Sequence, residues 1–339
     1  MKNLLYIGNK LSQHGYTVTS IETLGTFFEN EGYQLNYASS KKNKVLRFFD
    51  MLLKTWKFHK VTDFVIIDTY STSNFWYALA VSQLCRILKK KYIPILRGGD
   101  LPNRLKKNPK LCAMIFNNAF KNVAPSKYLM HYFELAKIRN LLYIPNTIEL
   151  DNYPLKLREN LEPKLLWVRS FAKIYNPKMA IDVLAIVKKQ FPDASLCMVG
   201  PEKDGSLAET KKYAAELGLE VTFPGRLSKK DWIALSENYD LFLNTTHFDN
   251  TPVSVMEALA LGLPVITTNV GGIPFLLENR KTAILVADGN VKEMANAVIH
   301  LLENSHIAIS LSQNSRELSK SFDWEQVKQS WNKILNNLD

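Results

Sequence analysis

Apolar and polar residues alternate with two different periods along the whole chain. Short runs rich in β-branched and aromatic residues predict strands, and the longer segments between them repeat apolar positions at helical spacing. This rhythm is typical of βα units around parallel sheets. In the first half we predict strands at 4–8, 34–38, 64–69, 92–97, 122–124 and 141–144, and helices at 21–31, 44–58, 74–90, 109–120 and 127–135. The rhythm starts again with predicted strands at 165–168, 195–199, 220–223, 241–244, 265–268 and 283–286.

A polar stretch separates the two halves. Pro154 and Pro163 bracket charged residues that follow neither period, which predicts a linker between domains. Near the end, Trp324, Val327, Trp331 and Ile334 recur at helical spacing and predict an amphipathic helix that needs a surface to cover. We therefore predict an α/β protein with two doubly wound Rossmann-like domains: residues 1–150, a linker at 151–163, residues 164–320 and a terminal helix within 321–339.

Composition excludes several classes of protein. The 339 residues are 46% hydrophobic and 22% charged, as in ordinary globular proteins. Cys85, Cys112 and Cys197 lack CxxC spacing, so we expect neither a disulfide framework nor a zinc site, and a reducing cytoplasm fits best. No GxGxxG follows the first predicted strand, and no Walker loop, HExxH or GxSxG occurs. Dehydrogenase, P-loop NTPase, zinc protease and hydrolase functions therefore lose their main support.

Positive charge is concentrated in the first half. Residues 1–150 hold 22 Lys/Arg and 9 Asp/Glu, whereas the whole chain has a formal charge of +11. The segment Lys41–Lys60 combines seven Lys/Arg with apolar residues at helical spacing, which suits an anionic membrane surface. The alternative is that its apolar stripe is core and its lysines are solvated. We expect no nucleic-acid partner, because no recognised nucleic-acid-binding module accompanies the charge.

The densest chemical signal is the window Asn244–Gly272, NTTHFDNTPVSVMEALALGLPVITTNVGG. A polar loop follows a strand, and a helix is predicted to begin near Pro252 with Asn250 or Thr251 as its cap. The free amides of such a helix start form an anion site that suits a phosphate. Glu257 is the charged residue of the apolar run that follows; it either accepts hydrogen bonds from ribose hydroxyls or pairs with a backbone group or a lysine.

These motifs resemble the retaining glycosyltransferase family 4, which has the two-domain GT-B fold. The resemblance rests on Asp249 and Glu257 with seven residues between them, on the ALALGLPV run after Glu257, and on the glycine pair at 271–272. In the second half it also includes ValGly at 199–200, PheProGlyArgLeu at 223–227 and ThrAlaIleLeuVal at 282–286. In the first half AlaProSer at 124–126 and IleProAsnThrIle at 144–148 are similar to family landmarks.

The resemblance implies a role for each matching residue. Glu257 would bind the ribose of a nucleotide-sugar donor, Asp249 would contact the donor sugar, and Arg169 and Lys173 would bind its phosphates. The family's fold also implies a central cleft between the domains, an acceptor site in the first domain, a donor site in the second, and a terminal helix that crosses back to the first. Arg97 follows a strand of the first domain, in the loop where many relatives carry a His, so it is a candidate catalytic residue of the cleft; the alternative is a purely structural role. The remaining implied donor contacts are Val253, Ser254, Gly225, Arg226, Leu227 and Gly200.

Three features depart from the family pattern. The first carboxylate is Asp249 rather than Glu, Arg169 and Lys173 are four residues apart instead of about five, and Phe275 stands where an acidic residue is common. These departures concern the contacts to the donor sugar.

The function predicted from the sequence is transfer of a sugar, with retention, from a nucleotide-diphosphate donor to a hydroxyl of a glycan or lipid-linked acceptor in surface polysaccharide synthesis. The resemblance implies neither a metal nor a further cofactor. We expect a cytoplasmic protein that is peripheral on the inner membrane face. The alternatives are a nucleotide-sugar epimerase of related architecture and a catalytically weak partner subunit; donor turnover with and without acceptor separates the three.

Overall fold

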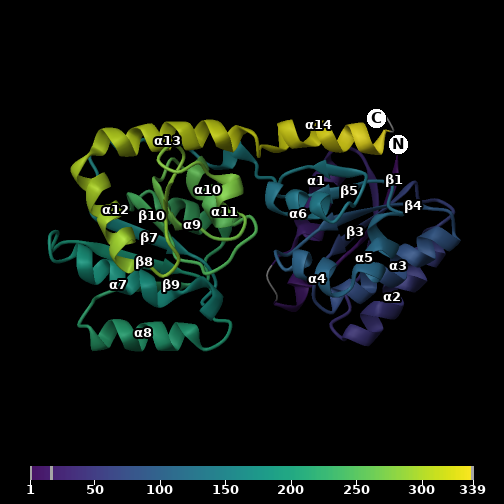
Figure 1. Ribbon diagram of the computed structural model, residues 1–339, viewed down its shortest axis with the longest axis horizontal. Coiled ribbons are helices and arrows are strands. Elements are labelled where there is room, and N and C mark those ends of the chain that lie inside the picture. The colour runs from purple at the N-terminus through teal and green to yellow at the C-terminus, as the bar shows by residue number, and fades with distance from the viewer. Residues whose placement is uncertain (1, 16–17, 337–339) are drawn as a thin grey trace. The chain divides into compact units, whose positions relative to one another are not determined.

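The computed structural model describes residues 2–15 and 18–336 and divides the chain into two compact units (Figure 1). The first unit comprises Met1–Thr147 and Val327–Asp339, and the second comprises Ile148–Gln326. Met1, Tyr16 and Thr17 of the predicted first domain, and residues 337–339 of the predicted terminal helix, lie outside the described residues.

The first unit contains a parallel sheet whose strands are ordered β2-β1-β3-β4-β5-β6 in the described residues. β3 is buried along its whole length, as expected for a parallel strand covered on both faces. Its strands are β1 (Asn3–Ile7), β2 (Gln34–Ala38), β3 (Phe64–Thr69), β4 (Lys91–Leu96), β5 (Asn122–Ala124) and β6 (Leu141–Tyr143). Its helices are α1 (Ser20–Asn30), α2 (Lys44–Phe58), α3 (Asn74–Ile87), α4 (Leu101–Lys107), α5 (Pro109–Phe116) and α6 (Lys127–Leu135).

The second unit repeats this plan with the strand order β12-β11-β10-β7-β8-β9. Its strands are β7 (Lys164–Val168), β8 (Ser195–Val199), β9 (Thr222–Gly225), β10 (Leu241–Asn244), β11 (Val265–Thr268) and β12 (Ile284–Val286). Its helices are α7 (Pro177–Val187), α8 (Ser206–Glu216), α9 (Lys229–Ser236), α10 (Val253–Ala260), α11 (Ile273–Leu276), α12 (Val291–Glu303) and α13 (Ser305–Lys320).

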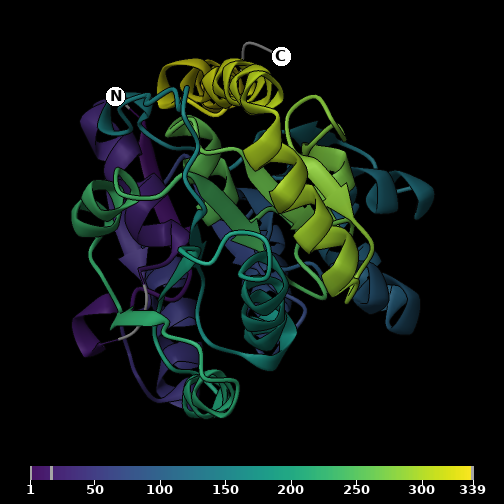
Figure 2. The same cartoon turned by 90° about the vertical axis from the view of Figure 1, so that its left-hand side faces the viewer.

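Helices cover both faces of the second sheet (Figure 2). Alternate strand residues point to opposite faces, so both faces carry buried apolar side chains. Leu165 and Trp167 of β7 pack in a core with α7 and α12, whereas Leu166 between them packs in a second core with α10. Both cores are closed by buried aliphatic and aromatic side chains. This doubly wound arrangement confirms the fold class that the sequence predicts.

The terminal helix α14 (Trp324–Leu335) packs on the first unit from Val327 onward. The rings of Trp331 and Phe28 meet edge to face with centroids 5.2 Å apart. The Tyr33 hydroxyl donates to Asn332 Oδ1 at 2.7 Å, and Lys328 pairs with Glu31 at 3.1 Å. The apolar stripe of this helix thus finds its surface on α1 and the turn that follows it.

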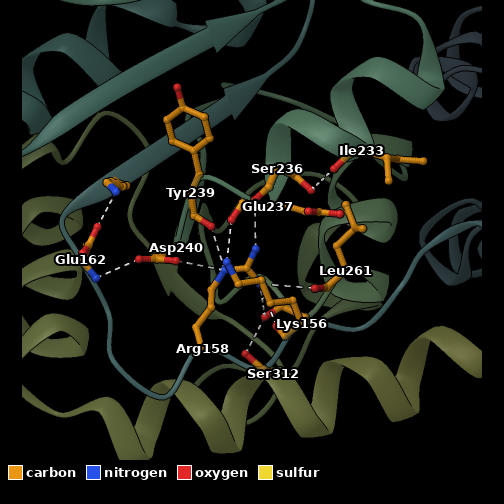
Figure 3. Close-up of polar contacts among 12 residues, drawn as sticks. Lys156, Arg158, Glu162, Ile233, Ser236, Glu237, Tyr239, Asp240, Leu261 and Ser312 are labelled. Carbon is orange, nitrogen blue, oxygen red and sulfur yellow. Dashed lines mark hydrogen bonds and ion pairs between the residues drawn. The ribbon is translucent and has the colours of Figure 1, made fainter.

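The segment 151–163, which we expected to be a linker, lies with the second unit and is fixed there by Arg158. Figure 3 shows the buried guanidinium surrounded by backbone carbonyls. Nε donates to Tyr239 O at 2.7 Å, Nη2 donates to Ser236 O at 3.0 Å, and Nε lies 3.3 Å from Asp240 Oδ1. The sequence does not predict this role of Arg158, because the carbonyls that it bonds belong to elements distant in the sequence and leave no periodic pattern around the arginine.

Two further predictions need correction. Residues 101–107 form α4, which the sequence did not predict, and the helix expected at 109–120 ends at Phe116. The strand expected at 220–223 is shifted to Thr222–Gly225. None of the helices in the described part of the chain has the length and apolar character required to cross a membrane.

Candidate functional site

The loops that follow β7 and β10 meet at the carboxyl edge of the second sheet. β7 and β10 are hydrogen-bonded neighbours, so the residues after Val168 and after Asn244 emerge side by side. Arg169 and Asp249 come from these two loops and form an ion pair between Nη2 and Oδ2. Both side chains are mostly buried. The structure therefore brings together two of the residues that the sequence nominated.

Arg169 is held in place through its backbone and its guanidinium plane. Its amide donates to Val199 O at 3.0 Å, and its Cζ lies 4.2 Å from the centroid of the Tyr175 ring. Gly200 has φ +153°, and a Cβ there would lie 1.7 Å from Arg169 O. Gly200 is thus required for the close approach of two backbones. Tyr175 was not predicted; burial alone would raise the pKa of its hydroxyl, but the Arg169 guanidinium outweighs burial and lowers this pKa.

Lys173 lies in a 3₁₀ turn, Lys173–Tyr175, between β7 and α7. Its backbone amide donates to Asp204 Oδ2 at 3.0 Å, which orders the turn, while its side chain is exposed. Among the described residues, the structure does not bring the Lys173 ammonium into the Arg169–Asp249 ion pair. The turn does bring Tyr175 onto the Arg169 guanidinium.

α10 begins directly after this loop, at Val253. Its N-cap is Pro252, which has no side-chain cap bond, so the prediction that Asn250 or Thr251 caps the helix is wrong. A helix leaves the amides of its first turn without intrahelical partners, and those of Val253 and Ser254 belong to this turn. Because Pro252 has no side-chain acceptor, no side-chain cap takes the amides of Val253 and Ser254, whereas the Val255 amide donates to Pro252 O at 3.1 Å.

Three buried hydrogen-bond donors near this helix start have no hydrogen-bond partner among the described residues. They are Arg169 Nε, Thr251 Oγ1 and Ser254 Oγ. A buried polar atom without a partner is costly, and such atoms are uncommon in native proteins. Here they accompany a buried cation and a helix N-terminus, which both favour negative charge. Donors of this kind on two neighbouring loops and the helix start suit the oxygens of an anion such as a phosphate.

The glycine pair at 271–272 fixes the path of the same loop. Gly272 donates its amide to Asp249 O at 2.7 Å. A Cβ at Gly272 would lie 1.8 Å from Asn250 O, and one at Gly271 would lie 2.2 Å from Asp249 O. Any larger residue would therefore displace the backbone that carries Asp249. This close backbone contact explains why glycine stands at both positions of the motif.

Glu257 lies one turn into α10 and is 5% exposed. Its Oε1 accepts a hydrogen bond from the Tyr153 hydroxyl at 2.7 Å and lies 2.9 Å from Lys229 Nζ. The lysine pairing that the sequence left as an alternative is thus present. Tyr153 lies in the segment expected to be a linker, and nothing in the local sequence singles it out. Burial, followed by the Glu257 charge, raises the pKa of Tyr153 well above its ordinary value, so its hydroxyl remains a neutral donor.

The residues nominated beside the base end β9 and lead into α9. Gly225 has φ +80° and accepts a hydrogen bond from the Gly200 amide at 2.9 Å through its carbonyl. Arg226 is exposed, and Leu227 is half-buried against the α10 core. Ser228 caps α9, whose first residue is Lys229. The loop 225–227 therefore leads directly to the lysine that contacts Glu257.

Arg97 belongs to the first unit and lies after β4. Its Nε is 3.1 Å from Asp68 Oδ1, and its Nη1 donates to Asn146 Oδ1 at 2.7 Å. Tyr6 also donates to Asp68 Oδ1, at 3.2 Å. Burial raises the pKa of Asp68 although Arg97 opposes the shift. The Arg97 guanidinium thus forms a buried ion pair with Asp68 at the carboxyl ends of β3 and β4.

No group of three or more His, Cys, Asp or Glu side chains with metal-site geometry occurs in the part of the chain that the structure describes.

Comparison with known proteins finds glycosyltransferases. Residues 154–318 match the family "Glycosyl transferases group 1". An uncharacterized glycosyltransferase of Haemophilus influenzae is 24% identical over 208 residues, which are 60% of this chain and 57% of that protein. Spore coat protein SA of Bacillus subtilis is 29% identical over 172 residues, which are 48% of this chain and 46% of that protein. The chain thus spans about half the length of these curated relatives.

Solved structures match over the full length of the chain. HepE of Anabaena, in complex with UDP, superposes with a TM-score of 0.79 at 18% identity, covering 99% of this chain and 100% of HepE. Sucrose-phosphate synthase from Thermosynechococcus elongatus superposes with a TM-score of 0.81 at 15% identity, covering 100% and 99%. At these identities the likeness establishes the fold alone, which is the two-domain α/β fold of the GT-B class.

Proposed function

We propose that this protein is a retaining glycosyltransferase of family 4 that transfers a sugar from a nucleotide-diphosphate donor to a hydroxyl of a glycan or lipid-linked acceptor. The observation that carries the proposal is the set of donors at the start of α10: Arg169 Nε, Thr251 Oγ1 and Ser254 Oγ are buried without hydrogen-bond partners among the described residues. Ser254 lies in the first turn of α10, one turn before the buried carboxylate of Glu257, Thr251 directly precedes the N-cap Pro252, and Arg169 joins the same loop through its ion pair with Asp249. A phosphate followed by a ribose matches this order of donors and acceptor.

The donor is assigned to these residues from its phosphates outward. The diphosphate accepts hydrogen bonds from the amides of Val253 and Ser254 and forms ion pairs with Arg169 and Lys173. The ribose hydroxyls donate to Glu257, and the base lies on the loop of Gly225, Arg226 and Leu227, beside Gly200. Asp249 faces the sugar, with its carboxylate oriented by the ion pair with Arg169. HepE has been crystallised with UDP and with UDP-glucose, which makes UDP the first nucleotide to test.

The chemistry follows from charge that develops on the leaving group. As the anomeric bond breaks, negative charge accumulates on the diphosphate, where Arg169 and the α10 amides stabilise it. The sugar passes through an oxocarbenium-like state, and the acceptor hydroxyl attacks from the face that the phosphate leaves. Because the attack is on this same face, the configuration is retained, and the departing phosphate takes the hydroxyl proton. These steps need neither a protein nucleophile nor a metal, and activity should survive EDTA; complete loss that Mg²⁺ or Mn²⁺ restores would contradict this part of the proposal.

The first unit is assigned to the acceptor, with Arg97 at the carboxyl edge of its sheet. We further propose a lipid-linked acceptor in surface polysaccharide synthesis, for which α2 offers a surface to a membrane. Lys41, Lys42, Lys44, Lys57 and Lys60 are exposed on or beside this helix. Its apolar residues Val45, Leu46, Phe49, Leu53 and Trp56 are each between 54% and 64% exposed.

The face of α2 that packs on the first unit is formed instead by Arg47, Met51 and Thr55. The alternative that the whole apolar stripe is core is therefore wrong for this part of the helix. An exposed apolar stripe flanked by lysines has the amphipathic character of helices that lie on anionic lipid. We assign α2 to peripheral attachment at an anionic membrane surface.

Donor turnover with and without an acceptor tests the transferase assignment. Nucleoside diphosphate should be released from one of several nucleotide-sugars, and a membrane extract containing lipid-linked glycans should accelerate the release. Donor conversion that is independent of acceptor would indicate an epimerase instead. Donor binding without any turnover would indicate a partner subunit, and in either case the transferase assignment would fail.

A further inference from the structure

Tyr153 contacts the Glu257 carboxylate through a buried hydrogen bond. Tyr153 is 1% exposed, and its hydroxyl donates to Glu257 Oε1 at 2.7 Å. Lys229 reaches the same oxygen from the surface, at 2.9 Å, with a side chain that is 56% exposed. Both contacts are on Oε1. The geometry of the carboxylate is therefore set from one side, and Oε2 lies outside these two contacts.

The position of Tyr153 is itself fixed by its backbone. Its amide donates to Leu150 O at 3.1 Å, and its carbonyl accepts from Arg316 Nη1 at 2.8 Å. The same Nη1 donates to Ala260 O, the last residue of α10, at 2.6 Å. Tyr153 is thus tied to α10 twice, through Arg316 at the end of the helix and through Glu257 one turn from its start. The ring also packs in the α10 core.

We propose that Tyr153 is a positioning residue for nucleotide recognition: it holds Oε1 of Glu257 so that the carboxylate meets the two ribose hydroxyls in one orientation. The inference rests on the proposed function, because it takes Glu257 as the ribose acceptor. A buried neutral donor suits this task, since it orients a carboxylate without neutralising it. Lys229 supplies the second donor to Oε1, and because its side chain is largely exposed, it contributes less to the orientation.

The role of Tyr153 can be separated from simple packing by two ligands that differ only in the ribose. The probes are UDP, or whichever of UDP, ADP and GDP binds wild type most tightly, and the 2′,3′-dideoxy form of the same nucleotide. The ratio of the two dissociation constants measures recognition of the ribose hydroxyls. A defect in folding or packing weakens the binding of both nucleotides alike and leaves the ratio of their dissociation constants unchanged.

Tyr153→Phe removes only the hydroxyl. It should weaken binding of the ribose nucleotide on the order of tenfold, as expected for a hydrogen bond to a charged group, and change dideoxynucleotide binding by less than about twofold. In the Glu257→Ala background the same substitution should have no further effect on the ratio, because the two residues act through one contact. Tyr213→Phe is the matched control, since Tyr213 donates to the Asp182 carboxylate at 2.6 Å in the same unit.

Lys229→Met provides a second variant at an exposed position and should shift the ratio in the same direction by a smaller factor. Wild-type discrimination that Glu257→Ala abolishes, but Tyr153→Phe and Lys229→Met leave intact, would overturn this inference alone. Equal binding of the ribose and dideoxy nucleotides by wild type would instead remove the ribose role of Glu257, and with it part of the proposed function.

Discussion

The carboxylate of Asp249, which is one methylene shorter than that of a glutamate, is bound in the ion pair with Arg169. Asp249 stands where the family 4 pattern described above has Glu, and it reaches Arg169 on a loop whose backbone path is set by the glycine pair at 271–272. The pair is mostly buried, so its two charges depend on each other. In the proposed function, Asp249 would orient the Arg169 cation at the donor phosphate while facing the donor sugar.

Asp249→Asn should impair turnover more than nucleotide binding. Loss of the carboxylate removes a contact to the sugar but leaves Arg169 free for the diphosphate. We expect kcat to fall by about 10- to 100-fold, with the Kd of the nucleoside diphosphate changed by less than about threefold. Steady-state donor turnover and calorimetry measure the two quantities. Asp182→Asn, a carboxylate on α7, is the control, and a loss of nucleotide affinity as large as the loss of kcat would contradict the assignment to the sugar.

At the scale of elements, the segment before β7 behaves as part of the second unit because one arginine organises it. Arg158 donates to carbonyls at Lys156, Ser236, Tyr239, Leu261 and Gly262 and pairs with Asp240. Figure 3 shows these groups converging on the guanidinium. The same segment delivers Tyr153 to Glu257. Its attachment would thus be a condition for the proposed nucleotide site.

Arg158→Met should destabilise the second unit by about 3 to 5 kcal/mol, because it leaves Asp240 and several carbonyls without their buried partner. Lys156→Met is the matched control: Lys156 Nζ also bonds a carbonyl, Glu237 O at 2.6 Å, but at an exposed position. Denaturant unfolding followed by tryptophan fluorescence measures the difference. Equal unfolding midpoints for the two variants would show that Arg158 does not anchor the segment.

The exposed face of α2 leads to a prediction about binding to anionic membranes. Replacing Lys41, Lys42, Lys44 and Lys57 by Gln should reduce sedimentation with anionic liposomes, since each surface lysine adds about 1 kcal/mol at low salt. Lys54, which the sequence alone would have included, is excluded because its Nζ donates to Tyr37 O at 2.9 Å and pairs with Asp50 at 3.4 Å. Leu53→Ser with Trp56→Ser should reduce sedimentation as well, because it removes the exposed apolar stripe.

The control for this experiment removes the same charge from the second unit, at Lys189, Lys211, Lys212 and Lys292, which are exposed. This variant should sediment like wild type, and all variants should keep nucleotide binding. Sedimentation of wild type that is equal with neutral and anionic liposomes at low salt would contradict the membrane role of α2.

For the whole molecule, periodicity was sufficient to predict the two sheets and most helices. Buried strands such as β3 begin as continuous apolar runs, and their predicted ranges agree with the structure to within a residue or two. α4 escaped prediction because its seven residues include three basic ones and little periodicity. The residues of the candidate site that follow strands were visible as motifs. Tyr153, Tyr175 and Lys229 were not, because each acts through a tertiary contact with a residue distant in sequence.

The most direct test of the central claim is a thermal-shift titration of wild type and Glu257→Ala with UDP, ADP and GDP. A ligand that binds only the native state stabilises it by about 2.7 kcal/mol at 100 times its Kd. We predict that one of the three nucleotides raises the unfolding temperature of wild type and that the same concentration raises that of Glu257→Ala by much less. No shift of wild type with any of them, or equal shifts for both proteins, would contradict the assignment of this loop, helix and carboxylate to a nucleotide-sugar donor.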